Sequence, residues 1–239
     1  MTKSVLGFGL TNDMKGIIYY TDNRLDEPIF FAVQRQILKA GLPIVSCSLR
    51  PINFGKNIVF NLERGPTTMV RQIIAALEAS ESDYVFFCEH DVLYHLTHFD
   101  FVLPSKDIFY YNANVWRWDF SGDKVITYDH LRSLSGLCVS RNKALEHYKK
   151  RLLIIQKKGF DKLPGRKTGW ARKMGYEPGK KTGEKTAEWR SEYPNIDIRH
   201  SKTMSPAKMT LGSFIHKPTG WRESTIDELG GWDLKELLT

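Results

Sequence analysis

The chain has 239 residues, of which 41% are hydrophobic and 26% charged, values of an ordinary globular protein that exclude a disordered or fibrous chain. No apolar run reaches the roughly 18 residues that a membrane-spanning helix needs, and we expect a cytoplasmic protein. The net charge of +8 favours polyanionic partners such as nucleotides or nucleic acid.

The first part of the chain alternates strand and helix patterns. Asp26 is expected to cap the first helix, with Pro28 in its first turn and Gly41 at its end. β-branched apolar runs predict strands at 15–21, 43–49 and 84–88, and apolar residues at helical spacing predict helices from residue 27 or 28 to about 40 and from just after Gly65 to about 80. Residues 51–62 are expected to form a loop. This order predicts a parallel sheet covered by helices.

After residue 105 the alternation stops. Residues 107–119 and 124–128 flank a turn signal and predict a hairpin. Further on, we expect a strand at 135–140, a helix at 141–156, an irregular stretch at 159–193, a short strand at 196–200 and a short terminal helix after Trp232.

The most informative feature is an acidic motif, Glu89-His90-Asp91, directly after the apolar strand 84–88. Ligands of parallel sheets bind outside the carboxyl ends of the strands. On an extended chain Glu89 and Asp91 point to the same side, so both are expected to serve one nucleotide and its metal. Carboxylates are the ligands that Mg²⁺ and Mn²⁺ take when they bridge phosphates.

With this motif the sequence resembles the GT-A glycosyltransferases, in particular their broad family-2-like group, whose hydrophobic strand ends in Asp-X-Asp or a relaxed form of it. The resemblance covers about residues 15–140. It implies a Rossmann-like α/β fold with a mixed, mainly parallel sheet and flanking helices. It also implies a nucleotide-sugar donor, here expected to be a UDP-sugar, and Mn²⁺ or Mg²⁺ bound by Asp91. Glu89 replaces the first Asp, and by similarity it faces the ribose or the water shell of the metal.

Other residues are expected at the donor end. Thr21, Asp22 and Asn23 follow the first strand, where the resembling family holds the base and ribose; a turn and helix cap is the alternative. Arg64 precedes the second helix and can meet the base or a phosphate, or be a plain surface residue.

The metal shell and the catalytic base are expected from the second half of the chain. Many GT-A enzymes complete the metal shell with a C-terminal histidine, and His200 fits that place, with His216 as the competitor. An inverting transferase needs a carboxylate base; Glu188 is our choice over Glu177 and Glu184, because the adjacent Trp189 offers a stacking wall. Solvated surface glutamate is the default interpretation of all three.

The segment 141–190 carries 16 Lys/Arg against 5 Asp/Glu, a surplus of 16 − 5 = 11. One pyrophosphate needs fewer cations, so a polyanionic acceptor is expected, such as a hydroxymethylated pyrimidine in DNA. A glycan, a lipid-linked sugar or a protein hydroxyl are the alternative acceptors.

We expect one GT-A-like domain over 1–239, with a nucleotide-sugar-binding half at 1–105 and an acceptor-binding half at 106–239. Two other classes stay open. A nucleotidyltransferase also uses carboxylate-held Mg²⁺ but normally shows a Gly-rich lysine signature near the first strand, which this chain lacks. A non-catalytic nucleic-acid-binding protein would not need acidic groups at two strand ends.

Overall fold

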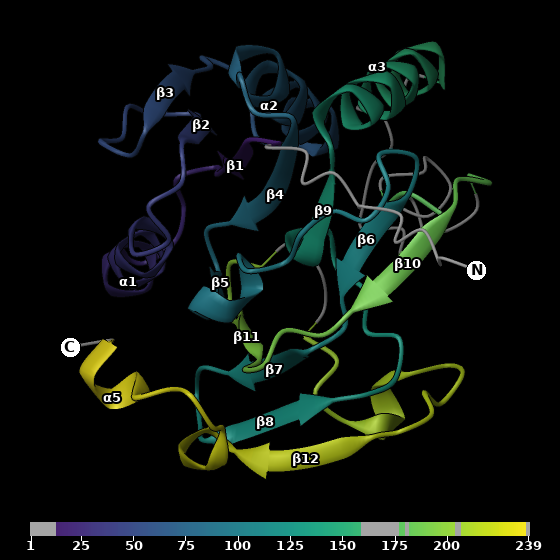
Figure 1. The fold of residues 1–239 in the computed structure, drawn as a ribbon. Helices are drawn as coiled ribbons and strands as arrows, with labels where there is room; N and C mark the ends of the chain where they lie inside the picture. Colours follow the sequence, from purple (N-terminus) through teal and green to yellow (C-terminus); the bar gives the residue numbers. More distant parts are fainter. Residues whose placement is uncertain (1–12, 159–176, 180–181, 204–206, 238–239) are drawn as a thin grey trace, which may run out of the picture.

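The computed structural model describes residues 13–158, 177–179, 182–203 and 207–237 (Figure 1). The strands are β1 (Lys15–Tyr20), β2 (Ile44–Ser48), β3 (Lys56–Val59), β4 (Tyr84–Glu89), β5 (Val92–Leu93), β6 (Phe109–Asn112), β7 (Val115–Asp119), β8 (Lys124–Thr127), β9 (Leu137–Ser140), β10 (Thr186–Trp189), β11 (Asn195–Arg199) and β12 (Arg222–Thr225). The helices are α1 (Glu27–Leu38), α2 (Pro66–Ala79), α3 (Arg141–Lys158) and α5 (Leu234–Leu237), with 3-10 turns η1 (Leu96–His98), η2 (Leu134–Gly136), η4 (Leu211–Ser213) and η5 (Ile226–Glu228).

Seven strands form the main sheet, in the order β10-β6-β9-β4-β1-β2-β3. Strand β9 is antiparallel to both of its neighbours, and the other pairs are parallel. The expected fold class, mixed α/β with a mainly parallel sheet and flanking helices, is confirmed. The carboxyl ends of β1, β2 and β4 lie at one edge of this sheet, which is where ligands of such sheets bind.

Two layers cover the faces of the main sheet. On one face, α1 and a second sheet pack over Ile17, Tyr19 and Phe86. This small sheet has the order β12-β8-β7-β11-β5 and fills the lower part of Figure 1. On the other face, α2 and α3 pack over Ile18 and Phe87. Because both faces of the central strands are buried, their sequences are apolar runs without polar alternation.

The expected loop at 51–62 contains a strand that sequence analysis missed. Strand β3 pairs in parallel with β2 and forms the edge of the main sheet. Its four residues, Lys-Asn-Ile-Val, are only partly buried, so neither an apolar run nor a clean alternation marks it. The acidic motif therefore follows the fourth strand of the chain, not the third.

The expected hairpin is confirmed only for β7 and β8, which pair antiparallel. The stretch 107–119 breaks after Asn112, whose side-chain oxygen accepts from the backbone N–H of Asn114 at 2.9 Å. Strand β6 stays in the main sheet and β7 enters the small one. The stretch expected to be irregular contains β10, which pairs with β6.

Helix α1 begins at Glu27 as expected, but its cap differs. Asp26 occupies the N-cap position without a side-chain hydrogen bond to the helix; its carboxylate instead pairs with Lys202. Gly41 follows the helix with a left-handed φ of 64°, a conformation that glycine adopts without penalty. The terminal helix α5 lies near α1 (Figure 1), where Arg35 Nη2 donates to the carbonyl of Leu237 at 2.9 Å.

The two expected halves are interleaved in space. The main sheet takes β1 to β4 from before residue 105 and β6, β9 and β10 from after it, and the small sheet likewise combines β5 with later strands. No helix in the described part of the chain is long and apolar enough to cross a bilayer.

Candidate metal and donor site

Three side chains meet at the carboxyl end of β4. One ligand atom each of His90, Asp91 and His200 lies within 4.8 Å of the others. Asp91 and His200 were expected as metal ligands, and the structure brings them together. His90 was not expected as a ligand. A carboxylate and two imidazoles at this spacing can hold one divalent cation.

The motif leaves the strand before Asp91. Strand β4 ends at Glu89, and the chain turns at His90 and Asp91. The side-chain alternation of a strand, which would point the Glu89 and Asp91 carboxylates to the same side, therefore stops at Glu89. Glu89 is not one of the three clustered residues. The Glu89 carboxylate accepts a hydrogen bond from the Tyr20 hydroxyl at 2.7 Å.

The end of β1 orients His90. Thr21 Oγ1 lies 2.8 Å from His90 Nδ1 and accepts from the backbone N–H of Asn23 at 3.0 Å. Because Nδ1 is held by the hydroxyl, Nε2 is the ring nitrogen left for a ligand, which is the usual arrangement around protein-bound metals. Thr21, expected as a donor contact, acts here as a support for the cluster.

Strand β11 positions His200, which directly follows it, at the cluster. It runs antiparallel to β5, and the N–H of Ile198 donates to the carbonyl of Asp91 at 2.8 Å. The residue after β11 is therefore brought beside the turn that contains Asp91. His200 Nε2 lies 3.6 Å from Asp91 Oδ2, with 6% of the histidine side chain and 13% of the aspartate side chain exposed.

His200 Nε2 is buried and has no hydrogen-bond partner among the described residues. Buried polar atoms are normally paired, so this nitrogen, 3.6 Å from Asp91 Oδ2, is a candidate metal ligand. Its Nδ1 accepts from the Lys202 N–H at 3.2 Å, which places the proton of the neutral ring on Nε2. A metal on Nε2 must displace that proton, as metal binding to histidine generally does.

The two carboxyl groups of the motif titrate in opposite directions. Burial raises the pKa of Glu89 to about 8, and the charge of Asp91 adds to the effect. For Asp91, burial also acts to raise the pKa, but the His200 imidazole and the charges of His90 and Arg199 outweigh it and hold the pKa below its usual value. Asp91 is thus the carboxylate suited to bind a cation near neutral pH.

Asp22 and Arg64 lie together at the neighbouring strand end. Arg64 Nε pairs with Asp22, and Arg64 Nη2 donates to the carbonyl of Lys202 at 3.1 Å. The pair therefore joins the end of β1 to the turn that follows His200. Both residues were expected at the donor, and the structure places them at the same edge as the metal cluster.

Asn23 has a structural role in this arrangement. It adopts a left-handed φ of 57°, and its side-chain oxygen accepts from the N–H groups of Leu49 and Arg50 at 2.8 and 3.0 Å. These bonds tie the end of β1 to the end of β2. Its expected donor contact stays a prediction.

Gln72 on α2 also holds the ends of β1 and β2 together. Its buried Nε2 donates to the carbonyls of Thr21 and Cys47, at 2.8 and 3.1 Å.

Replacing Gln72 with Leu leaves the Thr21 carbonyl without this donor, so we expect the free energy of unfolding to fall by about 1–3 kcal/mol. Urea unfolding measures the change. The exposed Gln156 on α3 offers a matched Gln→Leu control, expected to change stability by less than about 0.5 kcal/mol; equal effects in both variants would refute the assignment.

Glu188, the expected base, lies away from the cluster. It sits on β10, which is separated from β4 by β6 and β9. Arg132 Nε lies 2.5 Å and His130 Nδ1 3.0 Å from Glu188 Oε1. Burial works to raise the pKa of Glu188, but these two bonds lower it overall, which makes the carboxylate a weaker base. Its catalytic role stays a prediction.

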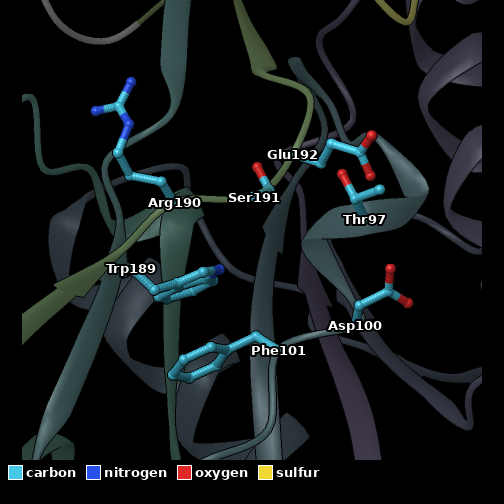
Figure 2. Close-up of a pocket in the computed structure, with 7 residues that line it drawn as sticks. All are labelled: Thr97, Asp100, Phe101, Trp189, Arg190, Ser191 and Glu192. Carbon is cyan, nitrogen blue, oxygen red and sulfur yellow. The ribbon is translucent and has the colours of Figure 1, made fainter.

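A separate hollow of about 360 Å³ lies between η1 and the end of β10. Figure 2 shows Trp189 and Phe101 face to face on one side of it, and the rings are 4.2 Å apart with an angle of 14°. His98 also stacks on Trp189, at 5.4 Å. The stacking surface expected of Trp189 is thus used inside the protein. The hollow is lined by Thr97, Asp100, Phe101, Trp189, Arg190, Ser191 and Glu192.

Part of the basic segment is described, and some of its cations have partners within the protein. Lys149 pairs with Glu78 at 2.6 Å, and the buried Arg151 lies 3.8 Å from Glu184. The doublet 180–181 lies outside the described residues.

Buried polar residues around the cluster were missed by sequence analysis. Arg199 lies beside Asp197, with Nη2 2.5 Å from Oδ2, and Arg117 Nε lies 3.5 Å from the same oxygen. Only the pattern Asp-Ile-Arg-His in 197–200 hinted that charged residues alternate with apolar ones on this strand.

No family model and no curated protein matches the sequence. Among solved structures, the apo-form glycosyltransferase GlyE of Streptococcus pneumoniae TIGR4 aligns with a TM-score of 0.43 and 13% identity over 73% of this chain and 45% of that chain. HddC from Yersinia pseudotuberculosis aligns with a TM-score of 0.43 and 12% identity over 77% of this chain and 93% of that chain. The chain thus spans less than half of the GlyE chain. Both TM-scores are too low to carry an argument, and the function is argued from the site.

Proposed function

We propose that this chain is a metal-dependent glycosyltransferase of the GT-A type, which moves a sugar from a UDP-sugar to an acceptor hydroxyl. The supporting observation is the cluster of His90, Asp91 and His200 within 4.8 Å at the carboxyl end of β4. It lies at the sheet edge where nucleotides bind in such folds. The Asp22–Arg64 pair at the end of β1 supplies groups for the ribose, the base or a phosphate.

The ligand set favours Mn²⁺ over Mg²⁺. Mg²⁺ prefers oxygen ligands, whereas imidazole suits transition-metal ions, and two of the three candidate ligands are imidazoles. A bound cation would neutralise the diphosphate as it leaves the sugar. Thr21 would keep the His90 ring in place, and the guanidinium of Arg64, which is paired with Asp22, would lie near the phosphates.

For the acceptor, we propose a hydroxymethylated pyrimidine in DNA. The support is the net charge of +8 and the surplus of 11 cations in 141–190, which suit a polyanion. A base in a duplex would have to leave the stack to reach a donor held at the sheet edge.

A donor screen by thermal unfolding tests the proposal. UDP-, GDP- and CDP-sugars are added to the protein with Mn²⁺, with Mg²⁺ or with a chelator. A ligand at 100 times its Kd stabilises the native state by about 2.7 kcal/mol, which corresponds to roughly 5–10 °C for a chain of this length. We expect the largest shift with a UDP-sugar and Mn²⁺, accompanied by slow release of UDP.

The control is His216→Ala, because His216 is exposed and lies outside the metal cluster; it should keep the full shift. Absence of a shift with every sugar nucleotide would refute the proposal. A shift with nucleoside triphosphates, together with release of pyrophosphate, would identify a nucleotidyltransferase instead.

A further inference from the structure

Three aromatic rings gather at the outer edge of the small sheet. Tyr128 follows β8 and Trp221 precedes β12, and the register Arg222–Thr127 places the two rings opposite each other. Their planes are nearly parallel, at 6°, with centroids 6.1 Å apart. Phe214 meets both edge-on, at 5.3 and 5.9 Å. We refer to Tyr128, Phe214 and Trp221 as the aromatic platform.

The platform does not belong to the core of the protein. The core side of the small sheet is formed by Trp118 and Val125, whereas Tyr128 lies on the opposite face by strand alternation. All three platform rings are half-buried, and the neighbouring Ile215 is 96% exposed. Strands β8 and β12 lie at the lower border of the molecule in Figure 1. Grouped apolar surface of this kind commonly marks an interaction site.

Cations surround the platform. The Arg117 guanidinium lies 5.5 Å above the Tyr128 ring, and Lys208 Nζ lies 4.9 Å from the centre of Phe214. Residues 207–223 contain three Lys/Arg and one Asp/Glu, a net charge of 3 − 1 = +2. Glu223 accepts from the Trp221 indole N–H at 2.8 Å and pairs with Lys124 at 2.8 Å. A second anion, Asp129, follows Tyr128 and lies 3.9 Å from Arg222. The surface therefore combines stacking faces with positive charge.

The platform is connected to the metal cluster through the small sheet. Arg117, which lies over Tyr128, reaches Asp197 on β11 at 3.5 Å. Strand β11 leads directly into His200. On its other side, Tyr128 is two residues from His130, which is bonded to Glu188. The register places Tyr128 at the Val115 end of the small sheet, whereas His200 follows β11 at the Asp119 end, so a strand bound at the platform would reach the proposed site only by extending along this sheet.

We infer that the aromatic platform binds single-stranded DNA by stacking a base on Tyr128 and Trp221 while the cations of residues 207–223 meet the phosphates. This inference rests on the proposed function, because it supplies the binding surface for a DNA acceptor. Aromatic rings among cations are the usual means of holding single strands. A neutral glycan would use the rings but not the cations. In an intact duplex the base faces are already stacked on one another.

The test is fluorescence anisotropy with a labelled single-stranded DNA of about 12 nucleotides, a site size typical of such surfaces. Stacking of one base contributes about 1–3 kcal/mol, so Trp221→Ala should weaken binding roughly 5- to 150-fold. Trp221→Phe keeps a ring and should lose less. Lys208→Gln should reduce the salt dependence of binding. The matched control is Phe120→Ala, since Phe120 is an exposed aromatic in the turn after β7 that packs on Trp118.

Equal affinity of Trp221→Ala and Phe120→Ala would overturn the inference, as would tighter binding of a single-stranded RNA or of a neutral oligosaccharide. Thermal unfolding of each variant shows whether it is folded, and Trp221→Phe keeps the test valid if the alanine variant is not. The donor screen is a separate measurement on the unaltered protein. DNA binding without any donor shift would refute the proposed function alone, and a donor shift without ring-dependent DNA binding would refute this inference alone.

Discussion

Replacing Asp91 with alanine is expected to abolish turnover and the stabilisation by Mn²⁺. Asp91 is the single carboxylate of the cluster, and its lowered pKa keeps it ionised. A bound cation contributes several kcal/mol to stabilising a leaving diphosphate, so we expect turnover to fall by about 10³-fold or more. UDP release and Mn²⁺-dependent thermal shift measure the two effects.

The Asp91 variant should still fold. Asp197 continues to neutralise the buried Arg199, and the loss of the Asp91 charge relieves repulsion on Glu89. Asp107→Ala removes an exposed carboxylate that precedes β6, at the edge of the main sheet opposite to the cluster, and should leave both measurements unchanged. Full turnover and an undiminished Mn²⁺ shift in Asp91→Ala would remove the metal-site assignment.

Lowering the pH is expected to destabilise the protein through His98. This ring is fully buried, and burial lowers its pKa to about 3. The unfolded chain, with an ordinary histidine pKa near 6.5, binds a proton that the folded protein excludes. The stabilising contribution is therefore complete above about pH 6.5 and is lost as the pH falls toward 3. The expected loss is about 1.4 kcal/mol per pH unit, on the order of 5 kcal/mol in total.

The contacts of His98 explain why it stays neutral. Its Nδ1 lies 3.0 Å from the amide nitrogens of both Asn112 and Asn195. Neither amide can be reversed, because their oxygens accept backbone N–H groups of other residues: Asn114 and Ser191 for Asn112, and His95 for Asn195. A proton on Nδ1 would point at the N–H groups of these two amides, so the doubly protonated, charged ring is disfavoured.

Urea unfolding of the wild type and of His98→Asn between pH 7 and pH 4 tests this prediction. The wild type is expected to be the more stable at pH 7, and its advantage should shrink as the pH falls. His216→Asn, at an exposed site, should follow the wild type throughout. A constant difference between the wild type and His98→Asn across this range would contradict the prediction.

Local patterns were sufficient for most of the main sheet. The apolar strands β1, β2 and β4 and the helices α1 and α2 were predicted with boundaries close to those observed, because burial on both faces leaves long apolar runs. Strand β3 was missed because an edge strand of four partly exposed residues carries no such run. Strand β10 was missed because its four residues alternate too briefly and are only partly buried.

By itself, the sequence determined the strand–helix alternation, the position of an acidic motif at the end of a buried strand, and the positive charge. The resemblance predicted Asp91 and His200 as ligands, and the tertiary structure decided that these two meet and that His90 joins them. Because the chain turns after Glu89, His90 belongs to the cluster and Glu89 does not. The pairing of β11 with β5 places His200 beside Asp91. Both depend on contacts between segments far apart in the chain, whose register follows from packing in three dimensions and leaves no local pattern in the sequence. The same holds for the aromatic platform, which the pairing of β8 with β12 assembles from residues that look ordinary in their own segments.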